Sequence, residues 1–103
     1  MTGSAVLDIG GDTGALVVYA DADLEGEEVE IAIRGATEPF AHNVVRARRA
    51  ESGVVFAAIF PAVRTGEYRI LRRAGIEPAE FVVSGGQVRE VDCRVSGRSA
   101  KHQ

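Results

Sequence analysis

One histidine and two arginines are spaced along a predicted strand in a way that suits anion binding. Segment 41–49 reads AHNVVRARR, and in it His42, Arg46 and Arg48 are separated by even numbers of residues. Because successive side chains of a strand point to opposite faces, this spacing places all three on one face. Histidine and arginine donate charge-assisted hydrogen bonds to carboxylates and phosphates. We therefore expect His42, Arg46 and Arg48 to bind an acidic group of a partner.

The same histidine is the candidate for acid–base catalysis. An imidazole-based metal centre needs further ligands, and the second histidine, His102, lies at the end of the chain. A hydrolase would need a nucleophile beside His42, and the sequence has no Gly-x-Ser-x-Gly motif. We expect no catalytic residues. The alternative is a small hydrolase that uses His42 with a carboxylate or a calcium ion.

A short acidic segment resembles part of a calcium-binding loop. Asp21, Asp23 and Glu25 precede Gly26 with the alternate spacing of the first oxygen ligands in an EF-hand loop. The position that should supply a bidentate glutamate is Ala32, and the flanking residues have strand character. We therefore expect no cofactor, with weak calcium binding at this loop as the alternative.

Composition indicates one small globular domain. The chain has 103 residues, of which 46% are hydrophobic and 26% charged. We expect a single domain over residues 1–95 and a flexible tail over 96–103. The lone cysteine, Cys93, excludes an intramolecular disulfide and favours a reducing compartment. Because neither a secretory leader nor a run of about 18 apolar residues is found, we expect a soluble, cytoplasmic protein with no membrane span.

Charge is segregated along the sequence. The charged residues of segment 8–30 are all acidic, whereas arginines dominate segment 34–73. In an antiparallel sandwich such segments pair across strands, so we expect matched charges on solvated faces, with an arginine-rich binding face as the alternative. The formal net charge of -3 and the lack of an aromatic stripe beside the arginines argue against a nucleic-acid partner.

The elements that position these residues are strands. Alternating and β-branched runs between glycine-containing turns predict an all-β, antiparallel β-sandwich of 7–8 strands with little or no helix. The glycine pair at 85–86 predicts a two-residue hairpin, and residues 10–14 predict an earlier, looser turn of the same kind. The expected strands cover residues 5–9, 15–20, 28–34, 41–49, 54–60, 67–73, 79–84 and 87–95.

Two of these runs are apolar on both faces, although a two-layer sandwich covers only one face of each strand. They are ALVVYA at 15–20 and VVFAAIF at 54–60. Exposed apolar patches usually mark interfaces. We expect a protein partner or a second copy of the chain, as a homodimer, to cover the outer positions. The alternative is that small residues such as Ala57 lie under long arginine side chains.

Segment 56–70 combines Pro61, which we expect to end a strand, with Gly66 and Tyr68 at the start of the next. A Gly-x-Tyr motif suits a corner where the tyrosine ring enters the core and its hydroxyl bonds to turn backbone. The segment resembles the end of prealbumin-like and carboxypeptidase-regulatory β-sandwich modules. That resemblance implies an immunoglobulin-like or prealbumin-like sandwich in which Pro61, Gly66 and Tyr68 have structural roles.

Over nearly its whole length the chain is similar to a family of small actinobacterial proteins with no assigned function. The motifs that carry this similarity are LDIGGDTGAL at 7–16, His-x-x-Val-Arg-x-Arg at 42–48 and Gly-Glu-Tyr at 66–68. Some members are labelled phospholipases, so the resemblance implies a phospholipase-like activity as one alternative. The residues themselves favour a non-catalytic binding or protein-interaction module, with a structural subunit of a larger assembly as the third reading.

Overall fold

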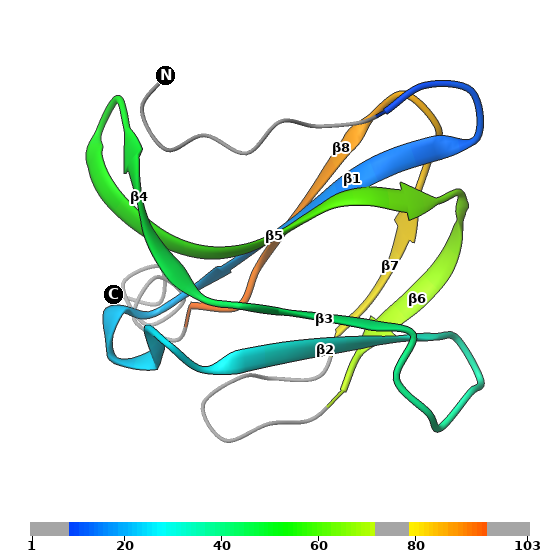
Figure 1. The fold of residues 1–103 in the computed structure, drawn as a ribbon, viewed down its shortest axis with the longest axis horizontal. Helices are drawn as coiled ribbons and strands as arrows, with labels where there is room; N and C mark the ends of the chain where they lie inside the picture. Colours follow the sequence, from blue (N-terminus) through cyan, green and yellow to red (C-terminus); the bar gives the residue numbers. More distant parts are fainter. Residues whose placement is uncertain (1–8, 72–78, 95–103) are drawn as a thin grey trace, which may run out of the picture.

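The fold is a sandwich of two β-sheets, as the sequence predicts (Figure 1). The computed structural model describes residues 9–71 and 79–94, so most of the strand expected at 5–9 and the tail expected at 96–103 lie outside the described residues. Over the described ranges it has one 3-10 helix, η1 Ala22–Leu24, and eight strands. The strands are β1 Thr13–Ala20, β2 Glu28–Ile33, β3 Ala41–Val44, β4 Arg46–Ala50, β5 Gly53–Arg64, β6 Gly66–Ile70, β7 Ala79–Val83 and β8 Val88–Asp92.

The chain passes repeatedly between the two sheets. The first sheet has the strand order β4-β5-β1-β8 and the second β3-β2-β6-β7. Among the described strand pairs, β1 and β8 run parallel and the others antiparallel. The parallel pair arises because β8 enters the first sheet from β7 of the second sheet and not through a hairpin.

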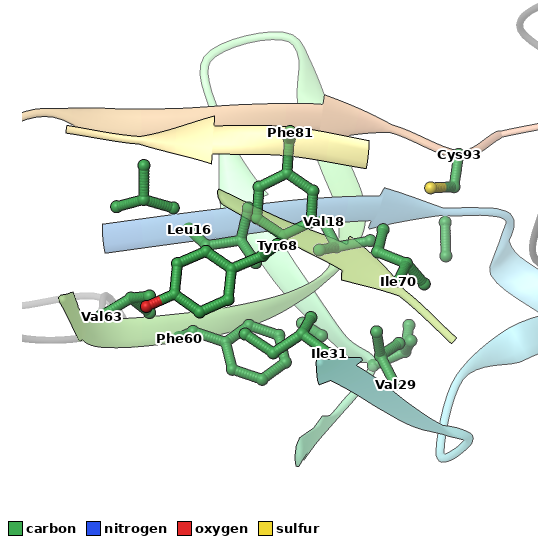
Figure 2. Close-up of a cluster of buried hydrophobic side chains, with 14 residues drawn as sticks. Leu16, Val18, Val29, Ile31, Phe60, Val63, Tyr68, Ile70, Phe81 and Cys93 are labelled. Atoms are coloured by element: carbon green, nitrogen blue, oxygen red, sulfur yellow. The ribbon is translucent and has the colours of Figure 1, made fainter. Parts of the chain in front are cut away.

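The apolar core of the described residues lies between the sheets. Alternate positions of the strands supply it, since a strand with one buried face turns every second side chain inward. In Figure 2 the side chains of Leu16, Tyr68 and Phe81 gather between strands of both sheets, and Cys93 lies toward one end. The buried cluster is Leu16, Val18, Ala20, Val29, Ile31, Val45, Ala58, Phe60, Val63, Tyr68, Ile70, Phe81, Val83 and Cys93.

The first glycine pair forms a turn, as predicted, and the turn is tighter than expected. Gly10 and Thr13 exchange two backbone hydrogen bonds, of 2.8 and 2.9 Å, around Gly11 and Asp12. Gly11 has a φ of 57°, in the region that favours glycine. The turn precedes β1 directly and fixes where that strand begins.

The second glycine pair, at 85–86, does not close a hairpin, because β7 and β8 belong to different sheets. Its turn instead lies against the first glycine turn. A Cβ atom added to Gly85 would overlap the carbonyl oxygen of Gly11, and one added to Gly14 would overlap that of Ser84. Gly85 therefore permits a close approach of two backbones, which local sequence does not reveal.

Pro61 lies inside β5 and does not end it, contrary to the prediction. The register between β1 and β5 shifts between Gly14 and Leu16, which pair with Val63 and Phe60, so that Pro61 lies in a β-bulge. Proline lacks a backbone donor and is tolerated at bulges. On its other side β5 pairs with β4 only as far as Ala57, so the proline removes no ladder bond there.

Tyr68 forms the predicted corner between the sheets. It is 3% exposed, and its hydroxyl donates a 2.8 Å hydrogen bond to the carbonyl oxygen of Arg64, at the end of β5. The ring centroid lies 5.4 Å from that of Phe40 and 6.0 Å from that of Phe81. Burial raises the pKa of the Tyr68 hydroxyl, which keeps it a donor. The corner thus joins β5 of the first sheet to β6 of the second.

Replacing Tyr68 by Phe is expected to lower the free energy of unfolding by about 1 kcal/mol, because the partly buried hydrogen bond to Arg64 is lost. Urea denaturation measures the change. Tyr19→Phe is the matched control, since its hydroxyl donates to the exposed carboxylate of Glu90. We expect that variant to lose less than about 0.5 kcal/mol. Equal losses in the two variants would contradict a special role for the corner.

Gly85→Ala is expected to cost about 1–3 kcal/mol, because a Cβ there meets backbone that has no room to yield. Gly66→Ala serves as the control. The atoms nearest to a Cβ at Gly66 belong to Tyr68 and lie 3.5 Å or more away, which is ordinary contact. Thermal unfolding compares the two variants, and identical melting temperatures would rule out the close approach of the two turns.

Candidate functional site

The segment from His42 to Arg48 is not one strand, contrary to the prediction. It divides at Val45 into β3 of the second sheet and β4 of the first. Val45 is fully buried; its N–H donates to the carbonyl oxygen of Glu27 at 2.9 Å, and its own carbonyl accepts from the N–H of Gly26 at 2.8 Å. Even spacing therefore no longer places His42 on the face of the arginines.

His42 lies on the outer face of the second sheet. It pairs with Glu30, which alternates along β2 with the core residues Val29 and Ile31. Its Nδ1 lies 2.8 Å from Oε2 of Glu28, and the side chain is 64% exposed. The arrangement is an exposed imidazole–carboxylate pair.

Other charges on this outer face are also matched across strands. Arg34 lies 3.1 Å from a carboxylate oxygen of Glu67 and 3.5 Å from one of Glu80. Arg69 donates a 2.7 Å hydrogen bond to the carbonyl oxygen of Ala36. The Arg34 contacts match opposite charges on this solvated face, although Glu67 and Glu80 lie outside the acidic segment 8–30. The His42–Glu28 pair does join the two segments, as predicted.

Arg46 and Arg48 lie together on the opposite side of the sandwich, on the outer face of the first sheet. They pair with Ala57 and Val55 of β5, which alternate with inward-facing Phe56. The Nε of Arg48 donates a 3.3 Å hydrogen bond to the carbonyl oxygen of Ala57, a residue that is 1% exposed. An arginine side chain thus lies beside the small residue, as one sequence alternative expects.

The environment of Arg48 disfavours its positive charge. Partial burial, and then the nearby charge of Arg46, lower the pKa of Arg48. Because two like charges raise each other's free energy, an anion placed between them would relieve the repulsion and gain charge-assisted hydrogen bonds. The pair is therefore suited to a carboxylate or phosphate of a partner.

We use the name first-sheet face for the outer surface that these arginines border. Of its central side chains Ala57 is buried and the others are half-buried, and an acidic edge on β8 lies opposite the arginines. Its members are Arg46 and Arg48 of β4, Val55, Ala57 and Ile59 of β5, Val17 and Tyr19 of β1, and Val88, Glu90 and Asp92 of β8.

The acidic edge is organised around Tyr19. The Tyr19 hydroxyl donates a 3.1 Å hydrogen bond to Glu90, and burial followed by this bond raises the pKa of the hydroxyl. Arg94 forms two hydrogen bonds, of 2.9 and 2.8 Å, with the carboxylate of Asp92. Its guanidinium also lies 5.3 Å from the centre of the Tyr19 ring. These contacts fix the side chains along the edge next to β8.

Asn43 is the residue of this segment that sequence reasoning missed. Its Nδ2 donates a 2.7 Å hydrogen bond to the carbonyl oxygen of Ile59, and its Oδ1 accepts from the N–H of Val44 at 2.8 Å. Because β4 pairs with β5 only as far as Ala57, the amide supplies the next hydrogen bond along that edge. No local signal marks this role, since asparagine is also typical of turns.

The acidic loop lies around η1. Asp21 precedes η1 without a side-chain cap hydrogen bond, Asp23 lies in it, and Glu25 follows it. Across residues 9–71 and 79–94, no three His, Cys, Asp or Glu side chains are grouped closely enough to hold a metal ion. Calcium binding by Asp21, Asp23 and Glu25 stays a prediction from the sequence.

A hollow of about 430 Å³, open to solvent, lies beside the Tyr68 corner. Ile33 and Phe40 supply apolar surface to it and are 50% and 45% exposed. On its rim Arg64 lies 3.7 Å from Asp12. Because the two rim charges pair with each other, the hollow presents mainly apolar surface.

No protein-family model, curated protein or solved structure matches the chain. The resemblance to an actinobacterial family stays an expectation from the sequence motifs. In the described part of the chain, no helix has the length and apolar character needed to cross a bilayer.

Asn43→Asp is expected to lower the free energy of unfolding by about 1–3 kcal/mol. Aspartate keeps the size and the acceptor for Val44, but it removes the donor to the partly buried carbonyl oxygen of Ile59. Asn43→Ala, which removes both bonds, is the comparison. Urea denaturation measures both variants; if neither changes the midpoint, the amide does not hold β3 against β5.

Proposed function

We propose that this protein is a non-catalytic module that binds a protein partner through the first-sheet face. In this proposal Arg46 and Arg48 bind an acidic group of the partner. The observation that supports it most directly is that two arginines on one face border the half-buried apolar side chains of Val55 and Ile59. An arginine-rich edge beside apolar surface is the composition found at protein interfaces.

The position of Arg48 favours binding further. A hydrogen bond to Ala57 already restrains its guanidinium, so less side-chain entropy is lost when a partner binds. Its planar group also forms two parallel hydrogen bonds with a carboxylate, which a lysine does not. Because of both features, we expect Arg48 to bind a carboxylate more tightly than an unrestrained cationic side chain would.

His42 is left out of this proposed site because it lies on the other sheet. Its imidazole pairs with Glu28 among other matched charges, an arrangement that is stable in solvent without a partner. The first-sheet face differs, since the charges of Arg46 and Arg48 repel each other and apolar side chains lie beside them. This contrast between the two outer faces favours the first-sheet face as the binding surface.

Replacing both Arg46 and Arg48 by Ala is expected to reduce capture of the partner at least about tenfold, because two charge-assisted contacts are lost. The measurement is affinity capture from an extract of the source cells, with quantitative mass spectrometry. Arg49→Ala is the control, since Arg49 is exposed on the same strand but pairs with Val54, on the alternate side.

The two variants should retain the melting temperature of the unmodified protein to within a few degrees, because each altered side chain lies on the surface. Capture that depends equally on Arg49 and on the Arg46–Arg48 pair would indicate only a general effect of charge. Unchanged capture by the double variant would refute the proposed function.

A further inference from the structure

We infer that the first-sheet face binds a second copy of the chain, through a two-fold axis that runs parallel to the strands between β5 and β1. This inference rests on the proposed function, since it names the partner for the same surface. Strand register determines which side chains lie on one line across the sheet.

Two such lines cross the face. Register places Arg46, Ala57, Tyr19 and Asp92 on one line, in that order from β4 to β8. The next line, about 7 Å along the strands, contains Ile59, Val17 and Glu90. Each line ends in a carboxylate at β8, and the first begins with an arginine at β4.

A two-fold axis that packs this face on its own copy must lie in the plane of contact, and two orientations align the strands. An axis perpendicular to the strands would place β4 over β4 and bring Arg46 against Arg46 of the other copy. An axis parallel to the strands reverses the strand order, so that β4 lies over β8. Only the parallel axis brings the arginine edge against the acidic edge. The perpendicular axis brings like charges together, so electrostatics favours the parallel axis.

The same axis also matches the sizes of the side chains. It places the large ring of Tyr19 opposite the small, buried Ala57 of the second copy, beside which Arg48 lies, and Val17 opposite Ile59. Packed sheets fill the space between them by such interdigitation of large and small residues. Because the operation is two-fold, each of these contacts occurs twice.

Glu90 is the acidic residue that we expect to pair with Arg46 of the second copy. Asp92 already binds Arg94, whereas the contact shown for Glu90 is the hydroxyl of Tyr19, which leaves its carboxylate further acceptor positions. Arg46 lies on the neighbouring line, within reach of a long side chain. Within one chain Arg46 and Glu90 lie on opposite edge strands, too far apart to pair with each other.

The test is analytical ultracentrifugation of the purified chain over a micromolar concentration series. We expect a dimer for the unmodified protein, and a dissociation constant at least about tenfold higher for Arg46→Glu and for Glu90→Arg. The double variant with both substitutions in one chain should regain the affinity, because Glu at 46 then meets Arg at 90 of the other copy. Under the perpendicular axis the double variant would repel itself, so recovery identifies the parallel axis.

Arg49→Glu is the control and should remain a dimer, since this exposed residue lies on the alternate side of β4. Melting temperatures confirm that every variant is folded. A monomer at all concentrations, or a double variant no tighter than the single ones, overturns the inference. If the chain is a monomer and capture still requires Arg46 and Arg48, only the second copy is wrong and the proposed function stands; if capture is also unaffected, both fail.

Discussion

The structure depends on one crossing, at Val45, where the chain leaves the second sheet and enters the first. A fully buried side chain and two backbone hydrogen bonds to the loop before β2 hold the crossing in place. Asn43 adds a side-chain hydrogen bond to β5 immediately before it. Burial of an apolar side chain, together with satisfied backbone groups on both sides, makes this position costly to move. Its location decides which residues share a surface.

The crossing gives the two outer faces different character. His42, before it, joins a face where arginines and glutamates are paired across strands. Arg46 and Arg48, after it, border apolar side chains and lie across the first sheet from Glu90 and Asp92. A face of matched charges is stable in water, whereas half-buried apolar side chains between charged edges are stabilised further by a partner. The proposed binding surface follows from this difference and not from any single residue.

Sequence reasoning predicted the features that depend on local pattern. Alternation located most of the described strands, and the Gly-x-Tyr motif located the corner at Tyr68. It failed where partner strands decide the outcome. A glycine pair has the same composition in a hairpin as in the inter-sheet turn at 85–86, and proline ends a strand unless a bulge accommodates it, as at Pro61. Even spacing likewise indicates a shared face only while the strand is continuous, and no local signal marks the break at Val45.

Cross-strand proton–proton contacts measured by nuclear magnetic resonance test the crossing most directly. We expect contacts of His42 with Glu30 of β2, and of Arg46 with Ala57 of β5, with the change of partner strand at Val45. An unbroken series of contacts from 41–49 to a single partner strand would contradict it, because His42 and the arginines would then share a face.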